Sequence, residues 1–288
     1  MKFNLQILAA AAAVLVAGPA TAALTLGSVA GGSSLVLSVW DNVANVSYTR
    51  NLGPNLNSFL PSGFTTLPND GTVTGTPNVG DKTPDGGLNL SFAGDALFAT
   101  TFGASQTANI EWNIVAIDQL VSNTLGLSRV ITTAAAKPST TNGGVGNIAA
   151  GGNNYFNALL ANTTIGNAGV NSVSTTESSL QSFAGNPNWG FGLNGGLNGV
   201  SSGGIGQSLG FFYLARTQIP TGATATLATN LQFANAAGAA TWTLGGDGTA
   251  IYNVSAVPLP PALWLMGSGL LAVAGAVRRR KAKASAKA

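Results

Sequence analysis

Hydrophobic and polar residues alternate along much of the chain between residues 23 and 256, and strict alternation is typical of a strand with one buried face. These runs are rich in valine, threonine and aromatic residues, which suit a pleated, half-buried surface. The pattern predicts an all-β body, folded as an antiparallel sandwich or a jelly-roll-like domain. The alternating runs are residues 35–40, 46–49, 88–92, 110–114, 211–216, 227–233, 241–244 and 250–257.

Glycine-rich turns separate these runs. Gly245–Gly248 lies between two of them and predicts a β-hairpin. Two stretches rich in small and polar residues, 134–152 and 186–207, are expected to be long loops. A short helix is expected over residues 155–162, where Tyr155 and Leu159 have helical spacing.

The first 22 residues have the features of a secretory signal peptide. Lys2 supplies the positive start, an apolar stretch follows, and Ala20 and Ala22 form an A-x-A cleavage site. The alternative is an N-terminal membrane anchor, but the apolar stretch is short beside the roughly 20 residues that a bilayer requires. We therefore expect residues 1–22 to be removed and residues 23–256 to form the exported body.

A second hydrophobic segment runs from Leu259 to Val277 without a charged residue. As a helix it would span roughly 28 Å, close to the hydrocarbon thickness of a bilayer, about 30 Å. The alternative is a buried core helix. A basic cluster follows at once and should remain cytoplasmic by the positive-inside rule, which places the body on the opposite side of the membrane. This cytoplasmic stop consists of Arg278, Arg279, Arg280 and Lys281.

A proline motif precedes the predicted membrane helix, so residues 257–288 contain three parts in order: motif, helix and basic end. The motif consists of Val257, Pro258, Leu259 and Pro260. The helix residues that carry the pattern are Ala262, Leu263, Trp264, Gly267, Ser268, Gly269 and Leu270.

This arrangement resembles the PEP-CTERM sorting tail and is closest to its V-P-L-P-A subtype. The founding motif has glutamate where this chain has Leu259, and the subtype has alanine where this chain has Pro261. The resemblance implies recognition by exosortase, a membrane transpeptidase of Gram-negative bacteria that make extracellular polysaccharide. The prolines have a simpler alternative role, which is to separate the last strand from the membrane helix.

The charge distribution and composition of the body exclude several kinds of binding site and catalytic site. Six of the 12 basic residues lie in the last eleven positions, and the body has five basic and nine acidic residues, a net charge of −4. Such a body lacks the cluster of lysine and arginine residues that nucleic-acid binding requires. The chain has no histidine and no cysteine, which excludes histidine-based catalysis, cysteine nucleophiles and thiolate metal sites. We accordingly predict no catalytic site, no metal site and no cofactor.

Acidic and aromatic residues supply the remaining candidate sites. Residues 81–86 partly resemble a calcium loop, and Asp41 has oxygen-bearing neighbours, but a simple turn is favoured for both. Glu111 alternates with core-like residues and should face solvent. We expect Trp112 and Trp242 to pack in the core rather than stack on sugars. Of the tryptophans, the one expected to be exposed lies in a loop, at Trp189.

These features predict an exported cell-surface or extracellular-matrix protein, associated with exopolysaccharide or biofilm and tethered transiently to the inner membrane. Its expected partners are signal peptidase, an exosortase-like enzyme and extracellular polysaccharide, and its role is structural or binding rather than catalytic. Two alternatives remain open. One is a secreted carbohydrate-active enzyme that uses two carboxylates, and the other is a single-pass membrane protein that is never cut.

Overall fold

The computed structural model describes most of the predicted body. The chain divides into two units, residues 1–256 and 257–288, and all the described residues belong to the first. The described residues are 14–16, 23–29, 31–60, 88–119, 128–167, 169–186, 201–216, 226–235 and 238–254.

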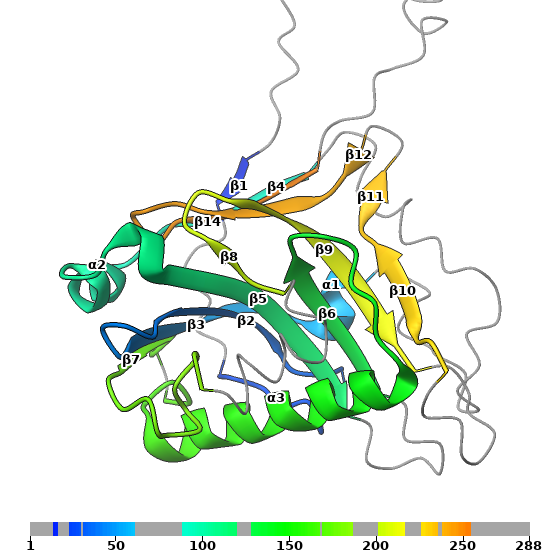
Figure 1. The fold of residues 1–288 in the computed structure, drawn as a ribbon, viewed down its shortest axis with the longest axis horizontal. Coiled ribbons are helices and arrows are strands. Elements are labelled where there is room, and N and C mark those ends of the chain that lie inside the picture. The colour runs from blue at the N-terminus through cyan, green and yellow to red at the C-terminus, as the bar shows by residue number, and fades with distance from the viewer. Residues whose placement is uncertain are drawn as a thin grey trace, which may run out of the picture. The chain divides into compact units, whose positions relative to one another are not determined.

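Twelve strands form one hydrogen-bonded sheet that curls on itself, as Figure 1 shows. Its main path runs β1-β4-β14-β13-β9-β6-β5-β2-β3-β7, while β10 pairs with β9 and β8 pairs with β5. Strands β11 and β12 form a separate two-stranded sheet. The bounds are β1 Val14–Val16, β2 Ser34–Asp41, β3 Val46–Asn55, β4 Leu88–Phe92, β5 Ile110–Gln119, β6 Ser128–Ala134, β7 Ser172–Thr175, β8 Gly203–Gly204, β9 Ser208–Ala215, β10 Thr229–Gln232, β11 Ala234–Asn235, β12 Gly238–Ala239, β13 Thr241–Leu244 and β14 Ala250–Val254.

The prediction of a mainly antiparallel β body is confirmed, since every strand pair described between residues 23 and 254 is antiparallel. The predicted hairpin joins β13 to β14 and is closed by the Gly245 N–H, which donates to the Thr249 carbonyl over 2.9 Å. The alternation did not mark β6 or β7. Strand β1 falls within the predicted signal peptide and pairs with β4 in parallel.

An aromatic core fills the inside of the curled sheet. Phe59, at the end of the short helix α1 (Leu56–Phe59), lies with its ring centroid 5.3 Å from those of Phe211 and Tyr252, edge-on to both. Trp242 packs 5.2 Å from Tyr252, and Leu37 from β2 joins the same buried cluster. Strands far apart in the sheet order therefore share one core.

The loop prediction for residues 134–152 is wrong over most of its length. Residues 142–152 form the first half of helix α3 (Asn142–Asn162), which also contains the short helix expected at 155–162. Thr141 caps the helix, since its side chain accepts a hydrogen bond from the Gly144 N–H over 3.1 Å. The other predicted loop, 186–207, holds β8 at its end, and its residues 187–200 lie outside the described chain.

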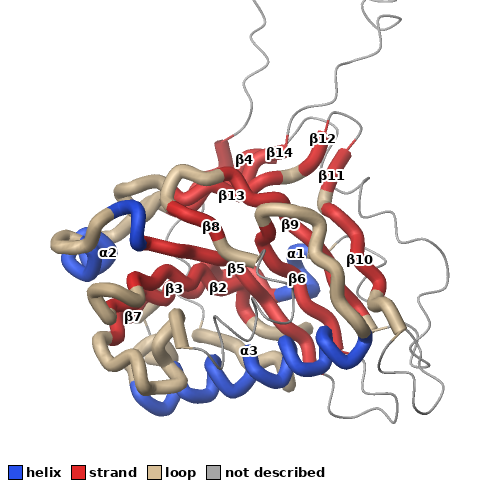
Figure 2. The backbone as a smooth tube through the Cα atoms, in the orientation of Figure 1, coloured by secondary structure: helices blue, strands red, loops and turns tan. Residues whose placement is uncertain are grey.

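Tertiary packing explains why this glycine- and asparagine-rich segment is helical. Its apolar residues recur at spacings of three and four, so they lie on one face and pack against the outer side of β5 and β6. Figure 2 shows α3 lying along that part of the sheet. Burial of this face offsets the low helix propensity of the sequence. The buried residues of the face include Val145, Ile148, Ala149, Gly152, Tyr155, Phe156 and Leu159.

The glycines of α3 provide a paired stability prediction. Glycine in a helix costs roughly 0.5–1 kcal/mol relative to alanine. At Gly146 an added Cβ would lie 3.4 Å from the nearest atom, Arg216 Nη1, so Gly146→Ala should raise the free energy of unfolding by about that amount. At Gly144 a Cβ would lie 2.2 Å from Thr140 Oγ1, so Gly144→Ala should give no gain. Urea unfolding of both variants measures this difference in stability, and equal stabilisation by the two substitutions would contradict the prediction.

Candidate functional site

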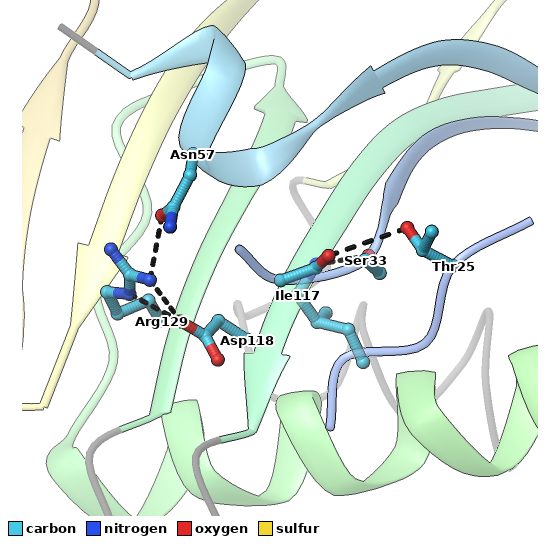
Figure 3. A network of polar contacts seen from close by, with 7 residues as sticks. Thr25, Ser33, Asn57, Ile117, Asp118 and Arg129 are labelled. Carbon is cyan, nitrogen blue, oxygen red and sulfur yellow. Dashed lines mark hydrogen bonds and ion pairs between the residues drawn. The ribbon is translucent and has the colours of Figure 1, made fainter. Parts of the chain in front are cut away.

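The residues that follow the predicted signal cleavage site are packed into the body. Leu24 is buried in the core beneath α3, and the Thr25 N–H donates to the Ser34 hydroxyl over 3.0 Å. The neighbouring Ser33 hydroxyl accepts from the Ile117 N–H over 2.9 Å, and this contact anchors the segment to β5 (Figure 3). Ala20 and Ala22 themselves lie outside the described residues.

The last described strand ends just before the predicted sorting motif. Strand β14 finishes at Val254 and lies between β4 and β13, well inside the sheet. The whole predicted tail, residues 257–288, with its motif, membrane helix and basic stop, lies outside the described residues. In the part of the chain that is described, no helix is long and apolar enough to cross a bilayer.

A buried ion pair lies where β5 and β6 pair, on the inner face of the sheet. Arg129 Nε donates to Asp118 Oδ2 over 2.9 Å, Nη2 bonds the same oxygen, and Nη2 also reaches Asn57 Oδ1 at 2.9 Å (Figure 3). Both charged side chains are almost fully buried. Burial, the strongest influence, raises the pKa of Asp118, and Arg129 opposes that rise. Each charge compensates the other, although Asp118 Oδ1 has no hydrogen-bond partner in the described part of the chain, and we assign the pair a structural role.

A second carboxylate, Asp95, joins three elements. It caps helix α2 (Ala96–Phe102) by accepting from the Phe98 N–H at 2.9 Å. Its Oδ2 accepts from the hydroxyl of Tyr48 on β3 at 2.9 Å and from that of Ser172 on β7 at 2.6 Å. Burial acts to raise the pKa of Asp95, but the three hydrogen bonds and nearby Arg50 together hold it below its ordinary value. Asp95 thereby links β7, a terminal strand of the sheet, to β3 and to helix α2.

The lowered pKa of Asp95 gives a pH prediction. A carboxyl whose pKa is lower in the folded than in the unfolded chain contributes stability above the unfolded value, about 3.9, and that stability is lost as the pH falls through the folded value. From about pH 4 downward, the free energy of unfolding should fall more steeply in the wild type than in Asp95→Asn. Ser172→Ala should raise the pKa of Asp95 in an NMR titration. An unchanged pKa of Asp95 would contradict the hydrogen bond from the Ser172 hydroxyl to Asp95 Oδ2.

The other described carboxylates mostly serve turns or face solvent. Asp41 Oδ1 accepts from the Val43 and Ala44 N–H groups at 2.8 and 3.0 Å, so the turn favoured for this segment is confirmed. Asp247 bonds Thr249 within the β13–β14 hairpin, and these bonds lower its pKa. Glu111 is exposed, as predicted.

The described residues hold no group of three or more acidic side chains positioned to bind a metal ion. The calcium-loop candidate, residues 81–86, lies outside them.

Trp112 and Trp242 are fully buried, which confirms their predicted place in the core, and Trp112 Nε1 donates to the Gly204 carbonyl over 2.8 Å. Trp189 also lies outside the described chain.

Sequence reasoning did not pair Asp118 with Arg129. One signal was available, since each is a charged residue beside a hydrophobic run in a chain with very few charges. The pairing itself depends on the β5–β6 register, in which the two residues are direct partners.

No protein-family model, curated protein or solved structure matches this chain. The proposal below therefore depends on the sequence of the two ends and on the chemistry of the body.

Proposed function

We propose that the chain is the precursor of an exported cell-surface or extracellular-matrix protein, with a structural or binding role in exopolysaccharide or biofilm. Signal peptidase removes residues 1–22, and an exosortase-type transpeptidase cuts near the proline motif. The observation that carries this proposal is the order of three parts in residues 257–288: a proline motif, an apolar helix-length segment and a basic end.

Each part of the tail has a physical task in this scheme. The apolar segment holds the precursor in the inner membrane, and the basic end keeps the C-terminus cytoplasmic. Pro258 and Pro260 fix their own φ angles, lack amide donors and push the preceding residues out of the α region. The motif is thereby kept extended and unpaired just outside the membrane, in a form that fits the cleft of a processing enzyme.

The body supports the proposal at both of its ends. Leu24 and Thr25 are already part of the fold, and β14 ends at Val254, so strands β2 to β14 all lie between the two expected cuts. Cleavage at either end would leave the aromatic core intact. Within the described residues, loss of residues 1–22 would remove β1 alone, which is a terminal strand of the sheet.

We also propose that the body is a jelly-roll-like sandwich. Side chains from β2, β5, β13 and β14 share one core, so the two arms of the curled sheet act as the two layers of a jelly-roll-like sandwich. A charge-poor β body of this kind suits a stable extracellular cargo.

Intact-mass analysis of the extracellular protein tests the proposal. The expected mass corresponds to a chain that begins near Ala23 and lacks residues 262–288, with any attached glycan visible as added mass. A full-length chain that stays in the membrane of cells with an active exosortase would instead support the uncut single-pass alternative.

A polysaccharide turnover assay on the same material addresses the enzyme alternative. Turnover that is lost when one aspartate or glutamate is replaced by its amide would contradict the binding role. We expect no such turnover, because Asp41, Asp95, Asp118 and Asp247 are engaged in turns, a helix cap and the buried ion pair.

A further inference from the structure

Among the described residues, no helix covers the outer face of one end of the sheet. Helix α3 packs on β5, β6 and part of β9, whereas β4, β13 and β14 lie at the other end of the sheet (Figure 2). Alternate residues of these strands and of the start of β9 point away from the aromatic core. We call these residues the outer face: Ser91, Ser208, Gly210, Thr241, Thr243, Ile251 and Asn253.

Strand register places these residues in two rows across the sheet. In the first row Thr243 lies between Ile251 and Ser208, and Ile251 also pairs with Ser91. In the second row Thr241 lies between Asn253 and Gly210. Neighbouring strands are about 4.7–4.9 Å apart, so the rows offer a regular array of polar groups on a firm backbone.

The chemistry of the outer face is neutral and amphipathic. Its residues include no acid and no base, while its hydroxyl and carboxamide groups can both donate and accept hydrogen bonds. Ile251 adds an apolar centre and is 39% exposed. A neutral sugar polymer presents the same mixture, with hydroxyl groups around apolar C–H faces.

Other classes of partner fit the outer face poorly. Polyanions such as nucleic acids are bound through lysine and arginine, which this face lacks. A second protein copy would need an apolar core within a patch of about 800 Å² on each partner, whereas the face exposes a single large apolar side chain, Ile251.

We propose that the outer face is a docking surface for a neutral polysaccharide chain, an inference that rests on the proposed export to an extracellular matrix. Thr241, Thr243 and Asn253 hydrogen-bond to sugar hydroxyls, and Ile251 contacts a sugar ring. The sheet supplies the rigidity, because β13 and β14 are paired on both sides.

Affinity electrophoresis of the mature extracellular protein tests this surface. Native gels contain a soluble neutral β-glucan, a soluble neutral mannan, or alginate as an anionic polysaccharide. At least one neutral polymer should retard the wild type more than alginate does. The triple variant Thr241→Val, Thr243→Val and Asn253→Ala keeps the shape of the strands but loses three polar groups, so binding should weaken about tenfold or more.

The matched control changes two exposed asparagines of α3, Asn154→Ala and Asn157→Ala, and should bind as the wild type does. Urea unfolding confirms that both variants are folded. No retardation by either neutral polymer, stronger retardation by alginate, or full binding by the triple variant would each overturn the inference. Those results leave the proposed processing intact, whereas an uncut mass would overturn the processing whatever the gels show.

Discussion

Replacing Asp118 with alanine is expected to lower the free energy of unfolding by about 3–5 kcal/mol, because it leaves the Arg129 charge buried without its partner. Arg129 makes two hydrogen bonds to Asp118 Oδ2, and both would be lost, while the bond to Asn57 would remain. Denaturation with urea, followed by tryptophan fluorescence, measures the loss. A loss below about 1 kcal/mol, the range of exposed ion pairs, would contradict this geometry.

The double variant Asp118→Leu with Arg129→Met is the control. Removing both charges avoids an unpaired ion, and an apolar pair of similar volume is often neutral or stabilising. The raised pKa of Asp118 agrees with this expectation, since burial outweighs the attraction of Arg129. We therefore expect the double variant to be at least as stable as the wild type. A double variant as unstable as Asp118→Ala would show that the packing of the polar groups, rather than the unpaired charge, causes the loss.

Replacing Pro258 and Pro260 with alanine is expected to abolish release of the protein and leave the precursor in the inner membrane. Alanine restores two amide donors and permits helical φ and ψ angles, so the motif can continue the proposed membrane helix. Fractionation of producing cells, followed by the mass of the membrane-bound form, measures the effect.

Pro261→Ala is the matched control for this test. It removes one proline from the same segment but places alanine where the V-P-L-P-A subtype has it, so release should be kept. Normal export of the Pro258→Ala, Pro260→Ala variant would remove the role assigned to the motif. Retention of both variants would show that the count of prolines matters rather than their positions.

Local alternation was sufficient to predict most of the strands. Runs such as 241–244 and 250–257 were recognised because apolar residues on one side and threonine or asparagine on the other already define a half-buried strand. The Asp41 turn, the buried Trp112 and Trp242, and the exposed Glu111 followed from the same logic. Each of these features depends on residues close together in the sequence.

Helix α3 shows where local reasoning failed. The five glycines and two asparagines of residues 142–152 suggested a loop, yet the spacing of Val145 and Ile148, continued by Tyr155 and Phe156, decided the outcome, because the sheet buries that face. Strand β6 was likewise missed, since it is buried along its whole length and shows no alternation of exposure.

By itself, the sequence determined the β character of the body, the likeness of its two ends to export signals, and the exclusion of histidine and cysteine chemistry. Only the tertiary structure decided which strands are neighbours, how Asp118 meets Arg129, and which part of the sheet α3 leaves uncovered. The reason is physical: alternation and composition are properties of a few adjacent residues. Strand order arises when segments more than a hundred residues apart share one core, and the Asp118–Arg129 pair depends on the register between β5 and β6.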